Sequence, residues 1–125
     1  MDKKFDLVQR VENLGKQVVS LAKIIPKNVV TIPLINQFVR SGTSIGANYC
    51  EADDAESEND YIHKVGIAKK EARETQYWLK MLVEACPDLK EKAIVVYQES
   101  KEINLIMNAI IRKLRIKKSN LGFRV

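Results

Sequence analysis

The sequence has few of the residues that build catalytic and metal sites. Its 125 residues include one histidine and two cysteines, and Cys50 and Cys86 match no metal-ligand spacing. A di-iron helical bundle needs Glu-x-x-His pairs on two helices, and His63 has no glutamate three residues before it. The Arg-x4-6-His motif of all-helical RNases, a phosphate-cradling glycine loop and a nucleophile elbow are also missing. We therefore expect no enzyme activity, no cofactor, no metal site and no small-molecule substrate.

The chain also lacks a long apolar run. No segment approaches the ~20 apolar residues that a membrane helix needs, and the charged start MDKKFD is unlike a signal peptide. Hydrophobic residues make up 46% of the chain and charged residues 30%, which is typical of soluble globular proteins. We expect a cytoplasmic protein with reduced cysteines and no membrane partner.

Apolar residues recur every three or four positions along four segments, and nothing alternates with the period of two that a strand needs. The predicted helices cover about residues 4–25, 32–54, 58–85 and 89–117. They form one domain, 1–118, and a C-terminal tail follows at 119–125. A repeat of 3.5 residues indicates a left-handed bundle, and short connections indicate antiparallel neighbours. The sequence predicts an all-α, antiparallel, up-down-up-down left-handed four-helix bundle.

The second predicted helix has almost no charge. Arg40 is the only charged residue from Asn28 to Cys50. On a helical wheel, uncharged side chains occupy positions where charges facing solvent are expected. These are Val39, Thr43, Ala47 and Cys50. Three neighbours within one bundle cannot surround this helix, so we expect it to pack against a second copy of the protein. The alternative is a low-charge helix that water solvates.

The fourth helix supports this expectation of a homo-oligomer. Several of its large apolar residues lie off the positions that face the core and would be exposed in a single chain. They are Ile94, Leu105, Ile106 and Ile116.

A polar stripe runs along the second helix beside the uncharged positions. A lone charge on a mostly buried helix needs partners, and Arg40 has candidates in Glu51, Glu71 and Glu74. The stripe and its expected partner on the third helix comprise Gln37, Arg40, Ser44, Asn48, Glu51 and Glu74. One interpretation is a buried polar network that fixes helix register or subunit orientation. The other is a ligand or nucleic-acid contact made by Arg40 and Asn48.

Basic and acidic residues gather in two different segments of the sequence. The C-terminal RKLRIKKSNLGFRV has six basic residues and no acid, whereas EADDAESEND between the second and third helices has six acids and no base. The bundle topology brings both to one end, so the basic residues either neutralise this acidic segment or bind nucleic acid, RNA or DNA, through a salt-sensitive phosphate contact. The residues predicted to make that contact are Lys3, Lys4, Arg112, Lys113, Arg115, Lys117 and Lys118.

The segment VRSGTSIGANYCEA resembles the core motif of the small four-helix-bundle proteins encoded by intervening sequences inside bacterial 23S ribosomal RNA genes. Their pattern is approximately R-x-x-x-S-I-x-x-N-x-x-E-G. The residues that match it are Arg40, Ser44, Ile45, Asn48 and Glu51. Ala68 and Glu74 in IAKKEARETQYWL are a second match, and Val39, Ala52 and Glu71 depart from the usual residues. The similarity covers nearly the whole chain.

The resemblance implies a four-helix bundle that assembles into a ring, commonly a pentamer, and no enzymatic activity. It does not imply a component of the ribosome, and it leaves a nucleic-acid role open. Together with the residue patterns, it predicts a non-catalytic, homo-oligomeric assembly or binding module. The alternative is an RNA-binding accessory protein that uses the clustered basic helix ends.

Overall fold

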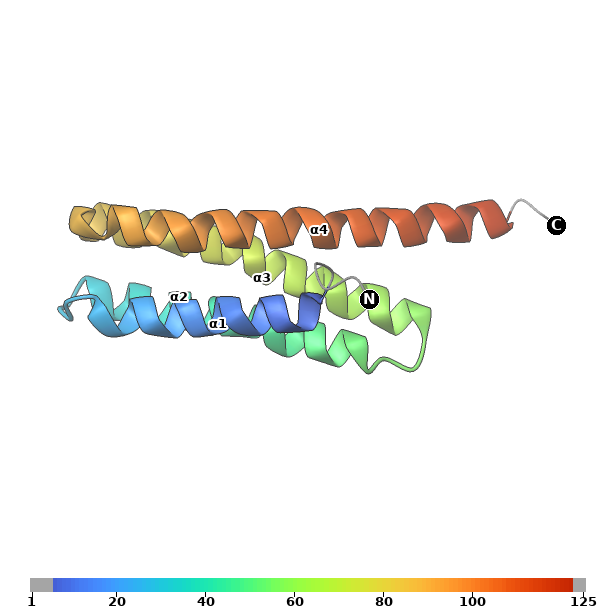
Figure 1. Cartoon of the computed structure of the whole chain (residues 1–125), viewed down its shortest axis with the longest axis horizontal. Coiled ribbons are helices and arrows are strands. Elements are labelled where there is room, and N and C mark those ends of the chain that lie inside the picture. The colour runs from blue at the N-terminus through green and yellow to red at the C-terminus, as the bar shows by residue number, and fades with distance from the viewer. Residues whose placement is uncertain (1–5, 123–125) are drawn as a thin grey trace.

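The computed structural model describes residues 6–122, and within this range the chain forms four long helices and no strand. The helices are α1 (Leu7–Ile24), α2 (Thr31–Asp53), α3 (Glu58–Ala85) and α4 (Lys90–Gly122), with a 3-10 turn, η2 (Pro87–Leu89), before α4. Consecutive helices run in opposite directions (Figure 1). The predicted all-α class and four-helix bundle are confirmed. In the described part of the chain, every helix is too short or too polar to cross a membrane.

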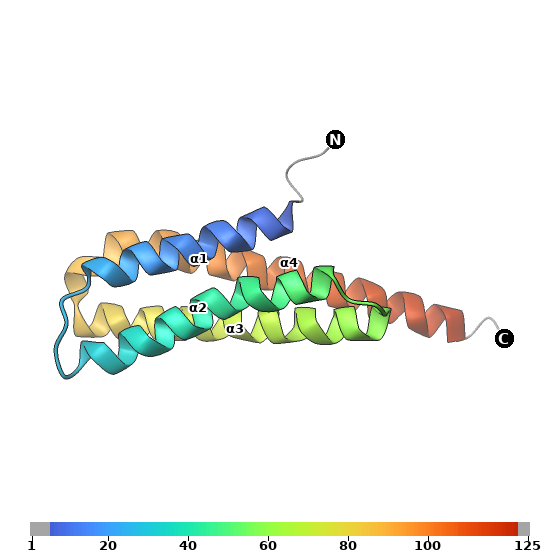
Figure 2. The ribbon, with the colours of Figure 1, turned by 90° about the horizontal axis from the view of Figure 1, so that it is seen from below.

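The four helices increase in length along the chain. They contain 18, 23, 28 and 33 residues, so α1 is about 27 Å long and α4 about 50 Å at 1.5 Å per residue. The helices are level at the end that holds the α1–α2 and α3–α4 connections. At the other end each helix reaches further than the one before it in the chain, so that α4 extends furthest (Figure 2). All four therefore surround a common core only along α1, and the C-terminal end of α4 extends past the start of α3.

Two boundaries differ from those expected from the sequence. The last helix continues to Gly122, so residues 119–122 of the expected tail are helical. No proline or glycine interrupts this helix before that residue, and nothing else in the sequence stops it earlier. The first helix begins at Leu7, where the Asp6 carboxylate accepts a bond of 3.1 Å from the Gln9 amide. Residues 1–5 and 123–125 lie outside the described residues.

The core consists of apolar residues that recur every three or four positions on the facing sides of the helices. The apolar residues with no exposed surface are Val11, Leu14, Val18, Phe38, Ile45, Val65, Ala68, Ala72, Leu82, Ile103 and Met107. They come from all four helices, so α1 is an integral part of the core although it is the shortest helix.

Glycine sets the distance between α1 and α2. A Cβ atom added to Gly42 would lie 2.6 Å from Cγ2 of Val18, closer than two carbon atoms can pack. Both residues are buried. At Gly46, one turn later, an added Cβ would meet only ordinary contacts, the nearest 3.4 Å away at the Val11 carbonyl oxygen. Gly42 therefore permits the close approach of α1 and α2, and Gly46 does not control it.

Candidate functional site

The polar network forms around Arg40, between α2 and α3. The Arg40 guanidinium donates to both carboxylate oxygens of Glu71, at 3.2 and 3.3 Å, and also to Glu74. Its Nε donates to Oε1 of Gln37 at 3.2 Å. Trp78 Nε1 donates to the same oxygen of Glu74, Oε1, at 3.2 Å. This geometry ties one arginine of α2 to two carboxylates of α3.

Three residues of the predicted stripe do not join this network. Ser44 donates to the carbonyl of Arg40 at 2.6 Å, and Asn48 donates to the carbonyl of Ser44 at 2.9 Å. Both side chains therefore form hydrogen bonds with the backbone of their own helix. Glu51 pairs instead with Lys64 of α3 at 2.7 Å, and this bond raises the pKa of Lys64. These three residues therefore have hydrogen-bond partners outside the network around Arg40.

Arg40 lies at the surface of the single chain and not in its interior. Its side chain is 46% exposed, whereas that of Glu71 is 18% exposed. The reason is that α2 has only α1 and α3 as close neighbours within the chain. The interhelical polar contact that is buried lies next to Arg40: Thr75 Oγ1 is 2.9 Å from Oγ of Ser41, with both residues fully buried.

A second arginine cluster links α1 to α4. Arg10 donates to both oxygens of Glu99, at 2.8 and 2.9 Å, and to Glu102 at 2.8 Å. These bonds, chiefly those to Glu99, raise the already high pKa of Arg10. Sequence reasoning missed the cluster. Its signal was the spacing of Glu99 and Glu102, which is the same Glu-x-x-Glu spacing as that of Glu71 and Glu74.

The groove between α1 and α2, here called the neutral groove, has a volume of about 600 Å³. Its α2 wall carries no charge and consists of Thr43, Gly46, Ala47 and Cys50. The α1 wall adds Gly15, Val19 and Ser20, together with Glu12 and Lys16, which pair with each other at 3.1 Å. Most of the α2 wall is exposed to solvent. Of the uncharged positions predicted for α2, Thr43, Ala47 and Cys50 are therefore exposed in the single chain, whereas Val39 packs partly against the core.

The basic end of α4 contacts the acidic connection only in part. Lys117 pairs with Glu58 at 3.7 Å, and Lys118 bonds to the Asn59 side chain. Arg112, Lys113 and Arg115 are exposed and form no ion pair within the described residues. Lys3 and Lys4 lie outside the described residues. The structure thus brings the basic and acidic segments together but leaves the cations nearer the middle of α4 without an acidic partner.

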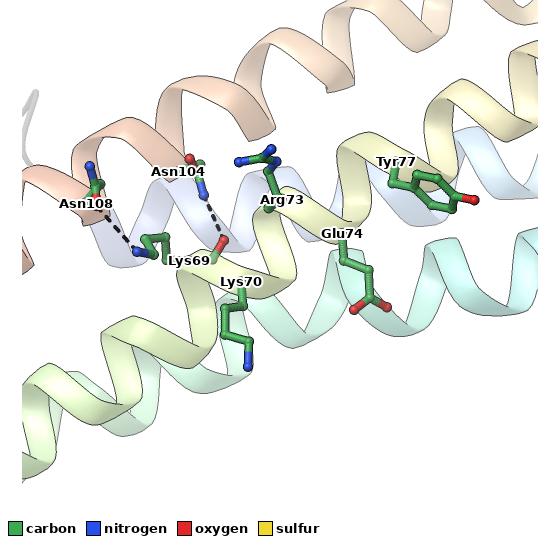
Figure 3. A pocket seen from close by; sticks show the side chains of 7 residues that line it. All are labelled: Lys69, Lys70, Arg73, Glu74, Tyr77, Asn104 and Asn108. Atoms are coloured by element: carbon green, nitrogen blue, oxygen red, sulfur yellow. Dashed lines mark hydrogen bonds between the residues drawn. The ribbon is translucent and has the colours of Figure 1, made fainter.

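A groove between α3 and α4, here called the basic groove, was not anticipated from the sequence. Figure 3 shows the side chains that line it. They are Lys69, Lys70, Arg73, Glu74, Tyr77, Asn104 and Asn108, around a volume of about 610 Å³. The Lys69 ammonium donates to Oδ1 of Asn108 at 3.4 Å, and Nδ2 of Asn104 donates to the Lys69 carbonyl at 2.9 Å. These bonds hold the two helices together at the floor of the groove.

The described residues also define what the site offers chemically. Among them, no three His, Cys, Asp or Glu side chains gather closely enough to hold a metal ion. Cys50 and Cys86 are free thiols. Tyr49 is a buried residue, and the pKa of its hydroxyl lies above the usual value, mainly because burial disfavours the phenolate; Tyr61 adds to the shift. Most polar side chains that line the basic groove carry amide, ammonium or guanidinium groups, which bind anions and hydrogen-bond acceptors.

Comparisons with known proteins agree with this fold. The family model of the 23S rRNA-intervening sequence protein matches residues 3–115. A crystal structure of a protein of unknown function from the S23 ribosomal protein family of Bacteroides thetaiotaomicron is similar in sequence and structure. It is 36% identical, the match covers 83% of this chain and 96% of that chain, and the TM-score is 0.75. A comparison with curated proteins gives no match.

Proposed function

Because the chain belongs to the 23S rRNA-intervening sequence protein family, as its motif predicted, we propose that it is a non-catalytic assembly and binding module made of several copies of itself. The copies form a ring in the cytoplasm, and the proposed number is five, which the family resemblance implies. The proposal assigns no catalytic activity, cofactor or small-molecule substrate. The neutral groove is the observation that carries it.

The α2 wall of the neutral groove is suited to contact with protein. Removing water from uncharged small residues costs little, whereas burying an unpaired charge is expensive. Thr43, Ala47 and Cys50 are exposed on this wall in a chain of which 30% is charged. Small side chains also let another helix approach closely. A second copy that covers this wall would give α2 the neighbour that its composition calls for.

Other exposed apolar residues support assembly. Ile94, Leu105 and Ile116 of α4 are 44%, 58% and 54% exposed, and Ile106 is half-buried. Large apolar side chains are also exposed around the α1–α2 connection, namely Ile24, Val29, Val30 and Ile32. Burying apolar surface contributes about 25 cal/mol per Å². Contacts between copies at these residues would therefore add to the stability of the ring.

The direct test places a charge in the neutral groove. Ala47→Arg puts a long cation on its α2 wall, and Gln17→Arg adds the same residue to α1 at an exposed position that does not line the groove. We expect light scattering at micromolar concentration to give an oligomer for the wild type and for Gln17→Arg, and smaller species for Ala47→Arg. Circular dichroism checks that both variants keep their helices. A monomeric wild-type protein would refute the proposal.

A second candidate function is nucleic-acid binding by the basic end of α4. It is favoured by the exposed Arg112, Lys113 and Arg115, which have no acidic partner within the described residues. In a ring, these ends would be repeated around one axis. A labelled RNA should shift at low salt and be released as salt rises. If the end of α4 makes the contact, reversing charge with Lys117→Glu and Lys118→Glu weakens binding, and absence of any shift at low salt refutes this function.

A further inference from the structure

We propose that the basic groove binds single-stranded nucleic acid, with phosphates along its cations and a base stacked on Tyr77. The proposal rests on the second candidate function, nucleic-acid binding, and places its main contacts on the side of the bundle, between α3 and α4, in a groove that leads to the basic end of α4. The observations that support it are the charge of the groove, its free hydrogen-bonding groups, its exposed aromatic ring and its continuation along α4.

The groove has a cationic wall without matching acids. Lys69, Lys70 and Arg73 line it from α3, and none of them has a carboxylate partner within the described residues. Glu74 is the acidic residue among the lining side chains, and its carboxylate is bound by Arg40 and Trp78. The groove therefore presents uncompensated positive charge, and a phosphodiester chain is the ligand that supplies negative charge at regular intervals.

The arginine clusters engage four acids of α3 and α4, so these carboxylates do not pair with the cations of the groove. Glu71 and Glu74 turn toward Arg40 of α2. On α4, Glu99 and Glu102 turn toward Arg10 of α1. Both Glu-x-x-Glu pairs are thus bound by arginines of α1 and α2, and this includes Glu74, which lines the groove. Lys70 and Arg73 of α3, by contrast, are exposed and form no ion pair within the described residues (Figure 3).

The two asparagines supply hydrogen-bonding groups that the protein does not use. Asn108 accepts from Lys69 through Oδ1, which leaves its Nδ2 free to donate to a phosphate oxygen. Asn104 donates through Nδ2 to the Lys69 carbonyl, which leaves its Oδ1 free to accept. A ribose 2′-hydroxyl or a base amino group is a donor for that oxygen. The floor of the groove can therefore contact the sugar or base as well as the phosphate.

Tyr77 provides a stacking surface at one end of the groove. Its side chain is 52% exposed, and its ring meets that of Trp78 edge-on with the centroids 5.0 Å apart. Trp78 is in turn held by its bond to Glu74. The ring is thus supported from one side and open on the other. Base–aromatic stacking does not depend on sequence and is typical of proteins that bind single strands.

The groove continues along α4 toward its basic end. An adjoining hollow of about 330 Å³ is lined by Asn108, Arg112 and Arg115, so Asn108 belongs to both. From Asn104 to Arg115 the distance along the helix is about 16 Å at 1.5 Å per residue. An aromatic ring at one end and cations along the rest describe an extended track. A single strand, whose bases are free to stack, matches it better than a duplex.

The experiment measures binding of the full-length protein to a labelled twelve-nucleotide RNA, to DNA of the same sequence, and to the corresponding duplex at low salt. Lys70→Glu with Arg73→Glu reverses the groove. Lys23→Glu with Lys92→Glu lowers the net charge equally at exposed positions of the opposite end and is the matched control. We expect the groove variant to bind single strands at least about tenfold more weakly and with a flatter salt dependence, and the control to bind nearly as the wild type does.

Tyr77 gives a test that charge does not influence. Tyr77→Ala should weaken binding of single strands about tenfold, since stacking contributes ~1–3 kcal/mol per base, and Tyr77→Phe should keep it. If the protein binds RNA more tightly than DNA, the groove also contacts the 2′-hydroxyl. If it binds both equally, the groove contacts only phosphates and bases. Both results agree with the proposal.

Three outcomes would overturn it. One is a groove variant that binds like the wild type while Lys117→Glu with Lys118→Glu loses binding, which leaves nucleic-acid binding in place and moves it to the helix end. Another is unchanged binding by Tyr77→Ala, and the third is a preference for duplex. If the wild type binds no nucleic acid at low salt, the second candidate function fails as well.

Discussion

The neutral groove and the basic groove are built from the same bundle geometry and have opposite surface chemistry. The α2 wall of the neutral groove has small uncharged residues such as Thr43 and Ala47, whereas the α3 wall of the basic groove has Lys69, Lys70 and Arg73. The first can lose its water at little cost, and the second holds water until an anion replaces it. The difference teaches that one small helical protein can separate a surface for its own copies from a surface for a charged partner.

The two arginine clusters maintain this difference. Each joins one helix of the α1–α2 pair to one helix of the α3–α4 pair: Arg10 bridges α1 to α4, and Arg40 bridges α2 to α3. They stabilise packing and also bind carboxylates that could otherwise pair with the cations of the basic groove. Substitutions at these sites should therefore change both stability and the contrast between the grooves.

The largest effect should come from the glycine beneath the neutral groove. Gly42→Ala places a methyl group against the stiff, buried Val18, and such overpacking costs about 2 kcal/mol in the free energy of unfolding. Gly46→Ala meets no close contact and should raise stability by up to about 1 kcal/mol, because alanine favours helix more than glycine does. Chemical denaturation measures both. If Gly42→Ala proves as stable as Gly46→Ala, close packing of α1 on α2 does not shape this groove.

The next effect concerns the α1–α4 cluster. Arg10→Ala removes three charge-assisted hydrogen bonds and leaves Glu99 and Glu102 close together without their cation. We expect a loss of about 1.5 kcal/mol in the free energy of unfolding, since hydrogen bonds to charged groups are stronger than neutral ones and these lie partly shielded from water. Arg10→Lys keeps the charge but cannot donate to both oxygens of Glu99 in the same geometry. This variant should therefore recover only part of the lost free energy of unfolding. If Arg10→Lys is as stable as the wild type, the positive charge alone accounts for the stabilising effect of this cluster.

Alkaline pH separates the core from the surface charges. Folding raises the pKa of Tyr49 above the usual 10.0, mainly through burial, so the folded state favours the protonated hydroxyl. Its contribution is complete below pH 10 and declines above it, by about 1.4 kcal/mol per pH unit until the folded pKa is reached. The comparison with Tyr49→Phe isolates the tyrosine, and this variant should lose less stability between pH 10 and 11 in thermal denaturation. Parallel curves for the two proteins would contradict the assignment.

The smallest effect on stability is expected at the α2–α3 cluster. Arg40 is nearly half exposed, so Arg40→Ala should cost only about 0.5–1 kcal/mol in the free energy of unfolding. Light scattering and RNA binding then distinguish its two interpretations. Lost assembly with a folded chain assigns Arg40 to subunit orientation, and an intact oligomer with lost binding assigns it to a ligand contact. A loss above about 3 kcal/mol would show that the network is buried in the assembled protein.

The fold could be predicted from the sequence because apolar periodicity and helix breaks are local signals. The predicted stripe was also local, and for that reason it was incomplete. The structure brings Gln37, Arg40 and Glu74 together, but Ser44 and Asn48 bond to carbonyls of their own helix, and no wheel distinguishes those alternatives. The pattern of residues along one helix predicts the face on which a residue lies, but it does not predict its hydrogen-bond partner.

The features that the sequence did not predict depend on how helices are aligned. The Arg10 cluster joins residues 89 and 92 positions apart, so its detection requires the register of α1 against α4. The basic groove likewise requires Lys69 to lie beside Asn104 and Asn108 on an antiparallel neighbour. Neither register is encoded in the spacing of residues within one helix. Both follow from the connections and from which ends of the helices are level.

The projecting end of α4 also bears on how a partner would meet this protein. The costly step in forming a helix is its nucleation, and further residues each add one hydrogen bond at little cost. Because α4 is nucleated inside the bundle, its last turn, beyond the contact between Lys118 and Asn59, extends an existing helix and projects past the other three helices (Figure 1). Backbone amides should therefore exchange with deuterium in order, from Gly122 inward. A molecule that binds this end therefore contacts a preformed helix, and binding costs little further conformational entropy of the chain.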